Sequence, residues 1–337
     1  MRGLTFVTGV AMALGVIGCE GSALAAACGS AYVVGDVFAS VGNSTVNVYQ
    51  PNGSLVCTMN DASGTTYTTG SGFDKFGNFY VTNFGVGTIS KFNNSGTLIN
   101  SAFMTSNNTP ESIVNVSVGP LAGTSFVGGP NAVAGAPVIN QYNTATGALM
   151  NSYTVAPGNG STGGTDWVDF KNDHVTVIYD SEGTIIKSYN IQTSTQNADF
   201  GTAPVYGYAM RVIPFGAFAG DVLRADSTEA NMFDANGNLI KTYSLPGQQG
   251  DDFALNLDPN GLDFWTSDSV SGTVWEINIA TGAIDEQWLT GVPGLTFGMA
   301  VYGEITSSSV TTPEPATLAI LGFGLVGTGF ARRLRHR

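Results

Sequence analysis

The sequence has few of the residues on which most enzyme active sites depend. Only two of its 337 residues are histidines, and only three, Cys19, Cys28 and Cys57, are cysteines. His174 has no neighbouring cysteine or second histidine, and the cysteines form no C-x-x-C pair. Structural zinc sites and thioredoxin-like redox chemistry use such groupings. A G-x-S-x-G motif is also absent, which argues against a hydrolase with a serine nucleophile at a strand-to-helix turn.

Charged residues are scarce as well, and basic ones most of all. Charged side chains make up 11% of the chain, and 12 Lys and Arg stand against 25 Asp and Glu. Five of the basic residues lie at the two ends, so residues 28–312 carry seven basic and 23 acidic side chains, a formal charge of −16. Such a surface repels phosphate backbones and argues against nucleic acid as a partner. Divalent cations or neutral glycans are compatible partners.

Glycine and aromatic residues are plentiful in place of charge. The chain has 45 glycines, and aromatic residues reach 10%. Glycine supplies the left-handed backbone positions of tight turns, and the apolar content excludes a disordered chain. This composition favours an all-β fold with many short strands.

Residues 1–27 have the features of a signal peptide. Arg2 precedes an apolar run from residue 4 to 17, and the small-residue pattern Ala23-Leu24-Ala25 follows it. A lipobox-like Val16–Cys19 is the alternative, in which Cys19 would carry a lipid. Removal of residues 1–27 leaves Cys28 and Cys57 as a candidate disulfide pair in an oxidising compartment.

The C-terminus has three ordered parts. A Ser/Thr linker and Pro313-Glu314-Pro315 occupy residues 307–315, and a Gly-rich apolar run, 316–331, predicts a short transmembrane helix. The basic end, residues 332–337, would stay on the cytoplasmic side by the positive-inside rule. The plain interpretation is a membrane anchor that leaves residues 28–306 outside.

This arrangement resembles the PEP-CTERM sorting signal of exopolysaccharide-producing bacteria. The resemblance implies recognition by an exosortase at the inner membrane, cleavage near the P-E-P motif, and a final place at the cell surface or in the extracellular matrix, with exopolysaccharide as a candidate partner. The residues that carry it are Pro313, Glu314, Pro315, Arg332, Arg333 and Arg335. Glu314 is then a recognition residue and not a catalytic carboxylate.

A repeat of about 45 residues runs through residues 28–306. Each copy has an apolar–x–aromatic strand, a turn and an x–Leu/Ile strand, and the period-two pattern predicts a β-hairpin. Five copies turn on a glycine and a degenerate sixth on a serine: Gly53, Gly96, Gly147, Ser194, Gly237 and Gly282. Upstream stretches at residues 72–87 and 255–272 add a strand–turn–strand element to two of the copies.

Four strands for each repeat predict a six-bladed β-propeller. The segment from Asp74 to Asn83 resembles the NHL/YVTN type of propeller repeat. The first copy lacks an innermost strand, and the stretch at residues 295–304 is available to supply it. We therefore expect a C-terminal strand to join the N-terminal blade and close the ring. Two stacked β-domains are the alternative.

Carboxylates are the only abundant reactive groups, and two places suggest a cation. Asp258, Asn260 and Asp263 partly resemble a calcium-binding loop, although the same pattern forms ordinary turns between strands. Alternatively, Glu111, Asp169 and Asp252 could begin inner strands and converge at one mouth of the ring. That would resemble the gluconolactonase-like propellers, which hold one divalent cation on such side chains.

Aromatic residues offer platforms for sugar rings. Candidates are Trp167, Trp265, Trp275, Trp288, Tyr206, Tyr208 and Phe215, although tryptophans at strand spacing are also typical of a blade core. Residues 202–220 fit the repeat least and are interpreted as an exposed binding loop.

Two functions remain open on the sequence alone. The first is a non-catalytic surface or matrix propeller that binds a glycan or a protein. The alternative is a metal-dependent hydrolase or lactonase with carboxylates in the channel.

Overall fold

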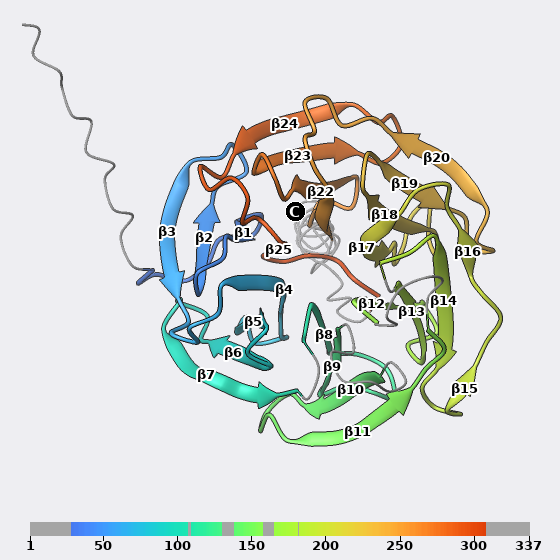
Figure 1. Cartoon of the computed structure of the whole chain (residues 1–337), viewed down its shortest axis with the longest axis horizontal. Coiled ribbons are helices and arrows are strands. Elements are labelled where there is room, and N and C mark those ends of the chain that lie inside the picture. Colours follow the sequence, from blue (N-terminus) through green and yellow to red (C-terminus); the bar gives the residue numbers. More distant parts are fainter. Residues whose placement is uncertain (1–27, 107–108, 130–137, 158–164, 181, 308–337) are drawn as a thin grey trace, which may run out of the picture.

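The computed structural model describes residues 28–106, 109–129, 138–157, 165–180 and 182–307. Within these ranges the chain forms 25 β-strands arranged in six sheets around a central axis, and no helix occurs (Figure 1). The fold is the six-bladed propeller with four-stranded blades that the repeat predicts. The predicted signal peptide, transmembrane helix and basic end lie outside the described residues. The part of the chain that is described contains no helix capable of crossing a membrane.

The first three blades each have four strands in a simple antiparallel order from the centre outward. The first contains β25 (Gly298–Val301), β1 (Val37–Ser40), β2 (Thr45–Tyr49) and β3 (Leu55–Asn60). The second contains β4 (Tyr67–Phe73), β5 (Phe79–Phe84), β6 (Thr88–Phe92) and β7 (Leu98–Thr105). The third contains β8 (Ser112–Val116), β9 (Thr124–Gly128), β10 (Val138–Asn143) and β11 (Leu149–Thr154).

The other three blades repeat this order with one irregularity in the fourth. The fourth contains β12 (Trp167–Phe170), β13 (Thr176–Asp180), β14 (Ile185–Asn190), β15 (Thr195–Gln196) and β16 (Gly201–Thr202). Both β15 and β16 pair with β14. The fifth contains β17 (Gly207–Val212), β18 (Val222–Asp226), β19 (Ala230–Phe233) and β20 (Leu239–Tyr243). The sixth contains β21 (Asp252–Leu257), β22 (Asp263–Asp268), β23 (Thr273–Asn278) and β24 (Ile284–Leu289).

The ring closes through the C-terminal strand, as the sequence predicts. Strand β25 pairs antiparallel with β1, in a register that sets Val37 opposite Val301 and Ser40 opposite Gly298. The first blade therefore takes one strand from the end of the described chain and three from its beginning. Because this pairing covers the inner edge of β1, no strand edge is left open where the ring begins.

The repeat corresponds to the two outer strands of each blade. All five turn glycines have a positive φ of 74–86°, which a residue without a Cβ adopts at little cost. The degenerate copy, which lies in the fourth blade, holds Ser194 at the same place, with φ 54°. There the outer strand β15 has only two residues. The degenerate copy is thus a complete turn followed by a truncated strand.

Replacing Ser194 by glycine is expected to stabilise the propeller by about 0.5–1 kcal/mol. The left-handed conformation costs a residue with a Cβ roughly 1–2 kcal/mol, and the greater freedom of glycine in the unfolded chain offsets part of that gain. Chemical denaturation of wild type and Ser194→Gly measures the difference. The matched change Gly147→Ser should destabilise, because a Cβ there would lie 2.0 Å from the Phe103 carbonyl oxygen. A destabilised Ser194→Gly protein would contradict this account of the turn.

The hydrophobic core lies between neighbouring blades. Its largest side chains are Trp265 and Trp275, both fully buried, and this matches the blade-core interpretation of the two tryptophans. Around them, alternate residues of adjacent blades form separate apolar clusters. The inner strands are buried on both faces, so all six residues of β17 are buried. Each blade therefore depends on both neighbours for its stability.

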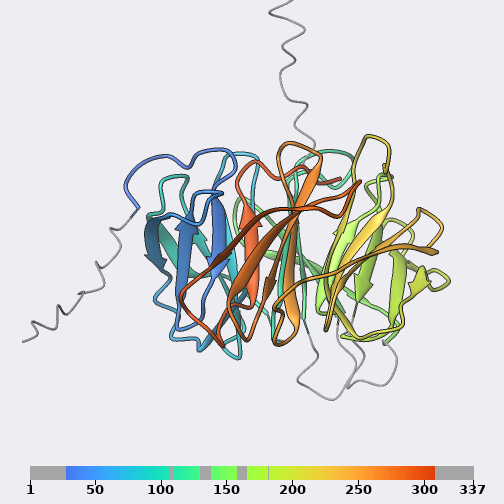
Figure 2. The ribbon, with the colours of Figure 1, turned by 90° about the horizontal axis from the view of Figure 1, so that it is seen from above.

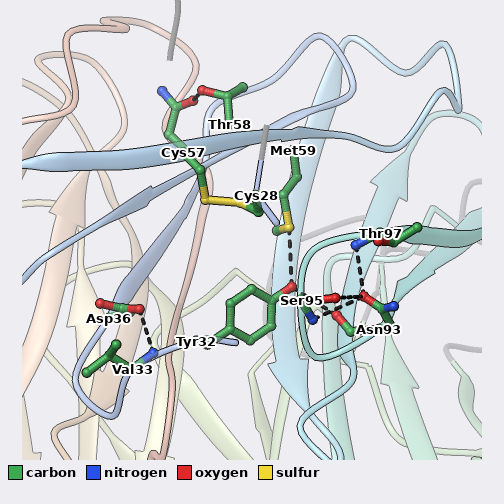
Figure 3. Close-up of a disulfide and its surroundings, with 11 residues drawn as sticks. Cys28, Tyr32, Val33, Asp36, Cys57, Thr58, Met59, Asn93, Ser95 and Thr97 are labelled. Atoms are coloured by element: carbon green, nitrogen blue, oxygen red, sulfur yellow. Dashed lines mark hydrogen bonds between the residues drawn. A yellow bond between two sulfur atoms is a disulfide. The ribbon is translucent and has the colours of Figure 1, made fainter. Parts of the chain in front are cut away.

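A disulfide fastens the N-terminal segment to the first blade. Cys28 is bonded to Cys57 of β3, with their Cα atoms 5.2 Å apart (Figure 3). Beside it, the Tyr32 hydroxyl donates to the Asn93 carbonyl oxygen at 3.1 Å. Cys28 also packs so closely on the next blade that a Cβ at Gly96 would lie 2.4 Å from its own. The segment before β1 is thus tied to two blades.

The disc has two distinct faces, seen edge-on in Figure 2. We call the side on which the innermost strands begin the start face. The opposite side, where these strands end, is the tail face, because the described chain leaves the propeller there at Ser307. The Ser307 hydroxyl donates to Asn172 Oδ1, in the turn between β12 and β13, at 2.6 Å.

Candidate functional site

Three carboxylates converge at the start face. Glu111 immediately precedes β8, Asp166 immediately precedes β12, and Glu182 lies in the turn between β13 and β14. Each offers an oxygen within 4.8 Å of those of the other two. Glu111 and Asp166 are 5% and 2% exposed. Glu182 has a positive φ of 50°, a strained value for a residue with a Cβ.

The cluster is short of hydrogen-bond donors. Among the described residues, Glu111 Oε2 and Asp166 Oδ1 are buried and have no hydrogen-bond partner. Burial, reinforced by the charge of Asp166, raises the pKa of Glu111 well above its usual range. Burial and the charge of Glu182 do the same to the pKa of Asp166. The cluster therefore binds positive charge favourably, as protons or as a metal ion.

The ligand chemistry of the cluster suits calcium. Calcium accepts six to eight oxygen ligands at 2.3–2.6 Å in flexible geometry, and carboxylates are among its usual ligands. Magnesium requires near-ideal octahedral geometry at 2.0–2.1 Å and is usually bound by only one or two carboxylates. Three carboxylates also supply more charge than a divalent ion neutralises. The described residues of the cluster fit a calcium ion with positions left for further ligands.

A buried ion network supports the cluster from the neighbouring blade. Arg224 is fully buried and its Nη1 donates to Asp180 Oδ2 at 2.9 Å. It also pairs with Asp226, and its Nη2 donates to the Val205 carbonyl oxygen at 2.7 Å. The guanidinium is therefore engaged by Asp180 and Asp226. It fixes the β13–β14 turn that presents Glu182.

The expected convergence of Glu111, Asp169 and Asp252 is right in part. Glu111 and Asp252 both lie at the start face, and both carboxylate oxygens of Asp252 are buried without a partner within the described chain. Asp169 points elsewhere: its Oδ2 accepts a hydrogen bond from the Val212 amide at 2.8 Å, near the tail face. The carboxylates that join Glu111 are Asp166 and Glu182, and Asp252 is not a member of this cluster. Strand β12 begins at Trp167, so Asp166 stands at its start and Asp169 lies within it, and Glu182 belongs to no sequence motif.

An arc of aromatic rings borders the remaining part of the start face. Tyr206, Tyr208, Phe253, Phe297 and Tyr67 follow one another across four blades, with successive centroids 5.9, 4.4, 5.2 and 5.3 Å apart. The rings at the two ends are exposed, Tyr206 by 39% and Tyr67 by 40%. The start face thus combines carboxylates on the third and fourth blades with aromatic surface on the others.

The sequence-based interpretation of residues 202–220 as one exposed loop is wrong. Residues 207–212 form the innermost strand of the fifth blade, and Tyr208 is buried. Only the flanks are exposed, with Tyr206 on the start face and Phe215 on the tail face. Because an inner strand is buried on both sides, it lacks the alternation that marks the outer strands. Trp167 is buried, and Trp288 packs against Tyr49.

The predicted calcium loop at Asp258, Asn260 and Asp263 is built as a turn between β21 and β22. Asp258 Oδ1 accepts from the Asn260 amide, and its Oδ2 accepts from Trp265 Nε1 at 2.8 Å. The Asp263 oxygens accept from the Asn260 and Asn278 side chains. These oxygens are occupied by protein donors, so the structure favours the turn over a calcium site here.

A cavity of about 210 Å³ lies at the tail face, away from the carboxylate cluster. It is lined by Arg211 and Glu304, whose Nε and Oε1 are 2.8 Å apart, and by Asp169. Burial raises the pKa of Asp169 to about 6, against the opposing effect of Arg211. Glu304 Oε1 also accepts from the Leu257 amide at 2.8 Å. Arg211 and Glu304 are paired with each other, and Asp169 accepts hydrogen bonds from the Phe170 and Val212 amides, so the charged groups of this cavity already have partners within the protein.

Comparison with known proteins identifies the C-terminal segment and the fold. Residues 311–335 match the PEP-CTERM protein-sorting motif, which marks an exported protein sorted by exosortase-type machinery and processed at the membrane. The motif residues lie outside the described part of the structure. No curated protein sequence matches the chain significantly.

The propeller is similar to solved structures at low sequence identity. One is a chain from the crystal structure of a nidogen/laminin complex, with a TM-score of 0.57 and 12% identity. The alignment covers 78% of this chain and 97% of that one. At this identity the similarity establishes the fold alone, and the function must be argued from the start face.

Proposed function

We propose that the exported propeller is a cell-surface or matrix protein that holds calcium at the start face and binds a glycan there. The observation that carries the proposal is the pair of unpartnered, buried oxygens of Glu111 and Asp166 beside an aromatic arc. A calcium ion accepts six to eight oxygens, so vicinal sugar hydroxyls can complete its coordination. The exposed ring of Tyr206 offers a face for the sugar C–H groups.

The acidity of the domain agrees with this assignment. With a formal charge of −16 over residues 28–312, the propeller repels a polyanionic polysaccharide unless a cation screens or bridges the two. A neutral glycan is not repelled by this charge. For an acidic glycan, bound calcium would reduce the repulsion. The dependence of binding on salt concentration, measured in the presence of calcium, therefore distinguishes the two glycan classes. Binding of an acidic glycan should change with ionic strength, and binding of a neutral glycan should not.

Binding of the purified protein to an array of bacterial and plant polysaccharides tests the function. We expect binding in calcium that is lost in EDTA. Tyr206→Ala should weaken it about 3–10-fold, the value of one aromatic contact. Tyr206→Phe keeps the ring and serves as the matched control, with affinity close to wild type. Binding that survives both EDTA and Tyr206→Ala would reject this site.

A metal-dependent hydrolase or lactonase is the second candidate, because the same three carboxylates leave open positions on a bound cation. A cation with an open position can polarise a carbonyl or activate water. Turnover of lactones or phosphate esters that requires calcium or another divalent ion, and that Glu111→Gln abolishes, would favour this function over binding.

A further inference from the structure

The chain leaves the propeller at a fixed point on the tail face. After β25 it crosses the face, where Glu304 Oε1 bonds to Arg211 at 2.8 Å and Oε2 accepts from Asn256 at 2.9 Å. It ends the described part at Ser307, which is fully buried and bonded to Asn172. The exit is therefore anchored to three blades and cannot move freely relative to the disc.

The distance from this exit to the sorting motif is short. Five residues, 308–312, separate Ser307 from Pro313, so even a fully extended chain places the Cα atoms of these two residues only about 20 Å apart. The six residues of β21 alone are about 20 Å long, so the tether is no longer than one inner strand and cannot carry the motif around the disc to the start face. While the motif is at the membrane, the tail face is the side of the disc that can reach it.

Exposed apolar side chains gather on the same face. Val33, Val34, Phe76 and Leu262 are exposed by 67%, 65%, 70% and 64%. They come from the segment before β1 and from the first turns of the second and sixth blades. Single exposed apolar residues are ordinary, but these four are the most exposed large apolar side chains of the described chain, and the strand topology places all four on one side.

Close contacts join these residues into one surface. A Cβ on Gly303 would lie 3.0 Å from Val34 and 3.4 Å from Pro259, in the turn that carries Leu262. A Cβ on Gly77 would lie 2.9 Å from the Tyr302 hydroxyl, beside the turn that carries Phe76. The C-terminal segment thus starts across the tail face between these apolar residues, at Tyr302 and Gly303, and then crosses to the fourth blade, where it leaves.

From this geometry we propose that the tail face rests on the lipid surface while the sorting tail is in the membrane, with Val33, Val34, Phe76 and Leu262 in contact with lipid. The net charge of −16 opposes spontaneous binding to anionic lipid, so the tether supplies the proximity. In this orientation the carboxylates and aromatic arc of the start face point away from the membrane.

Lipid-depth quenching in the full chain tests this orientation. Single cysteines in a Cys19→Ser background carry a nitrobenzoxadiazole label at Phe76 or Leu262 on the tail face. The matched controls are Val86 and Val270, which are 46% and 47% exposed in start-face turns of the same two blades. The full chain is reconstituted in phosphatidylcholine/phosphatidylglycerol vesicles that contain shallow spin-labelled lipid.

We expect quenching at Phe76→Cys and Leu262→Cys to exceed that at Val86→Cys and Val270→Cys by at least threefold. Equal quenching at the four positions, or stronger quenching at the two controls, would overturn the proposed orientation. Non-reducing electrophoresis confirms that the Cys28–Cys57 bond is intact in each variant, so a misfolded protein is recognised before the comparison is made.

Discussion

Arg224→Met is expected to lower the free energy of unfolding by about 3–5 kcal/mol, the largest effect of any single change considered. Arg224 is the buried cation between Asp180 and Asp226, and all three side chains are fully buried. Methionine fills a similar volume but leaves two carboxylates without their counter-ion. The loss comes from those stranded charges, because an isolated buried carboxylate is strongly disfavoured. Urea denaturation monitored by tryptophan fluorescence measures it.

A second ion pair provides the matched control. Lys187 Nζ and Asp199 Oδ1 are also 2.8 Å apart, but the Asp199 side chain is 49% exposed. Lys187→Met should therefore cost less than about 1 kcal/mol. Adding Asp180→Asn and Asp226→Asn to the Arg224→Met protein should recover part of its stability. If Arg224→Met costs no more than Lys187→Met, the buried network does not stabilise the fold as argued.

Glu111→Gln is expected to have two effects of opposite sign. It should abolish the stabilisation by calcium, which for the wild type reaches about 2.7 kcal/mol at a calcium concentration 100 times the dissociation constant. In EDTA the same change should stabilise the protein by about 1 kcal/mol or more, because it removes one of three crowded carboxylates. A glutamine amide can also donate to the unpartnered Asp166 oxygen.

Thermal unfolding with calcium and with EDTA measures both effects. Asp285→Asn is the control, since Asp285 is exposed on the outer strand β24 of the sixth blade and is not a member of the Glu111, Asp166 and Glu182 cluster. Its response to calcium should equal that of the wild type. A Glu111→Gln protein that is destabilised in EDTA would indicate that the carboxylate has a structural partner instead of a metal-binding role.

The outer half of each blade was predictable from the sequence because its physics is local. A hairpin needs period-two alternation and a residue that tolerates positive φ, and Gly53, Gly96 and the others are visible as such. Ring closure by residues 295–304 followed from counting strands, and β25 confirms it. The inner strands were harder to recognise, since burial on both sides removes the alternation, as in β17.

The carboxylate cluster could be predicted only in part. Glu111 could be expected because it immediately precedes an inner strand, but Asp166 and Asp169 are equally plausible from sequence, and only the register of β12 decides between them. Glu182 reaches the cluster from a turn, 71 positions after Glu111, through blade-to-blade packing. The opposite case is the segment with Asp258, Asn260 and Asp263. These residues are close in sequence, but they form a turn in which protein donors already occupy the carboxylate oxygens.

Calorimetric titration of calcium into the chelator-treated protein tests the central claim most directly. The start-face site predicts one ion bound per chain, with binding abolished in both Glu111→Gln and Asp166→Asn and retained in Asp263→Asn. No binding to the wild-type protein would contradict the account. Binding that persists in Glu111→Gln and Asp166→Asn but disappears in Asp263→Asn would contradict it equally, by moving the site to the turn after β21.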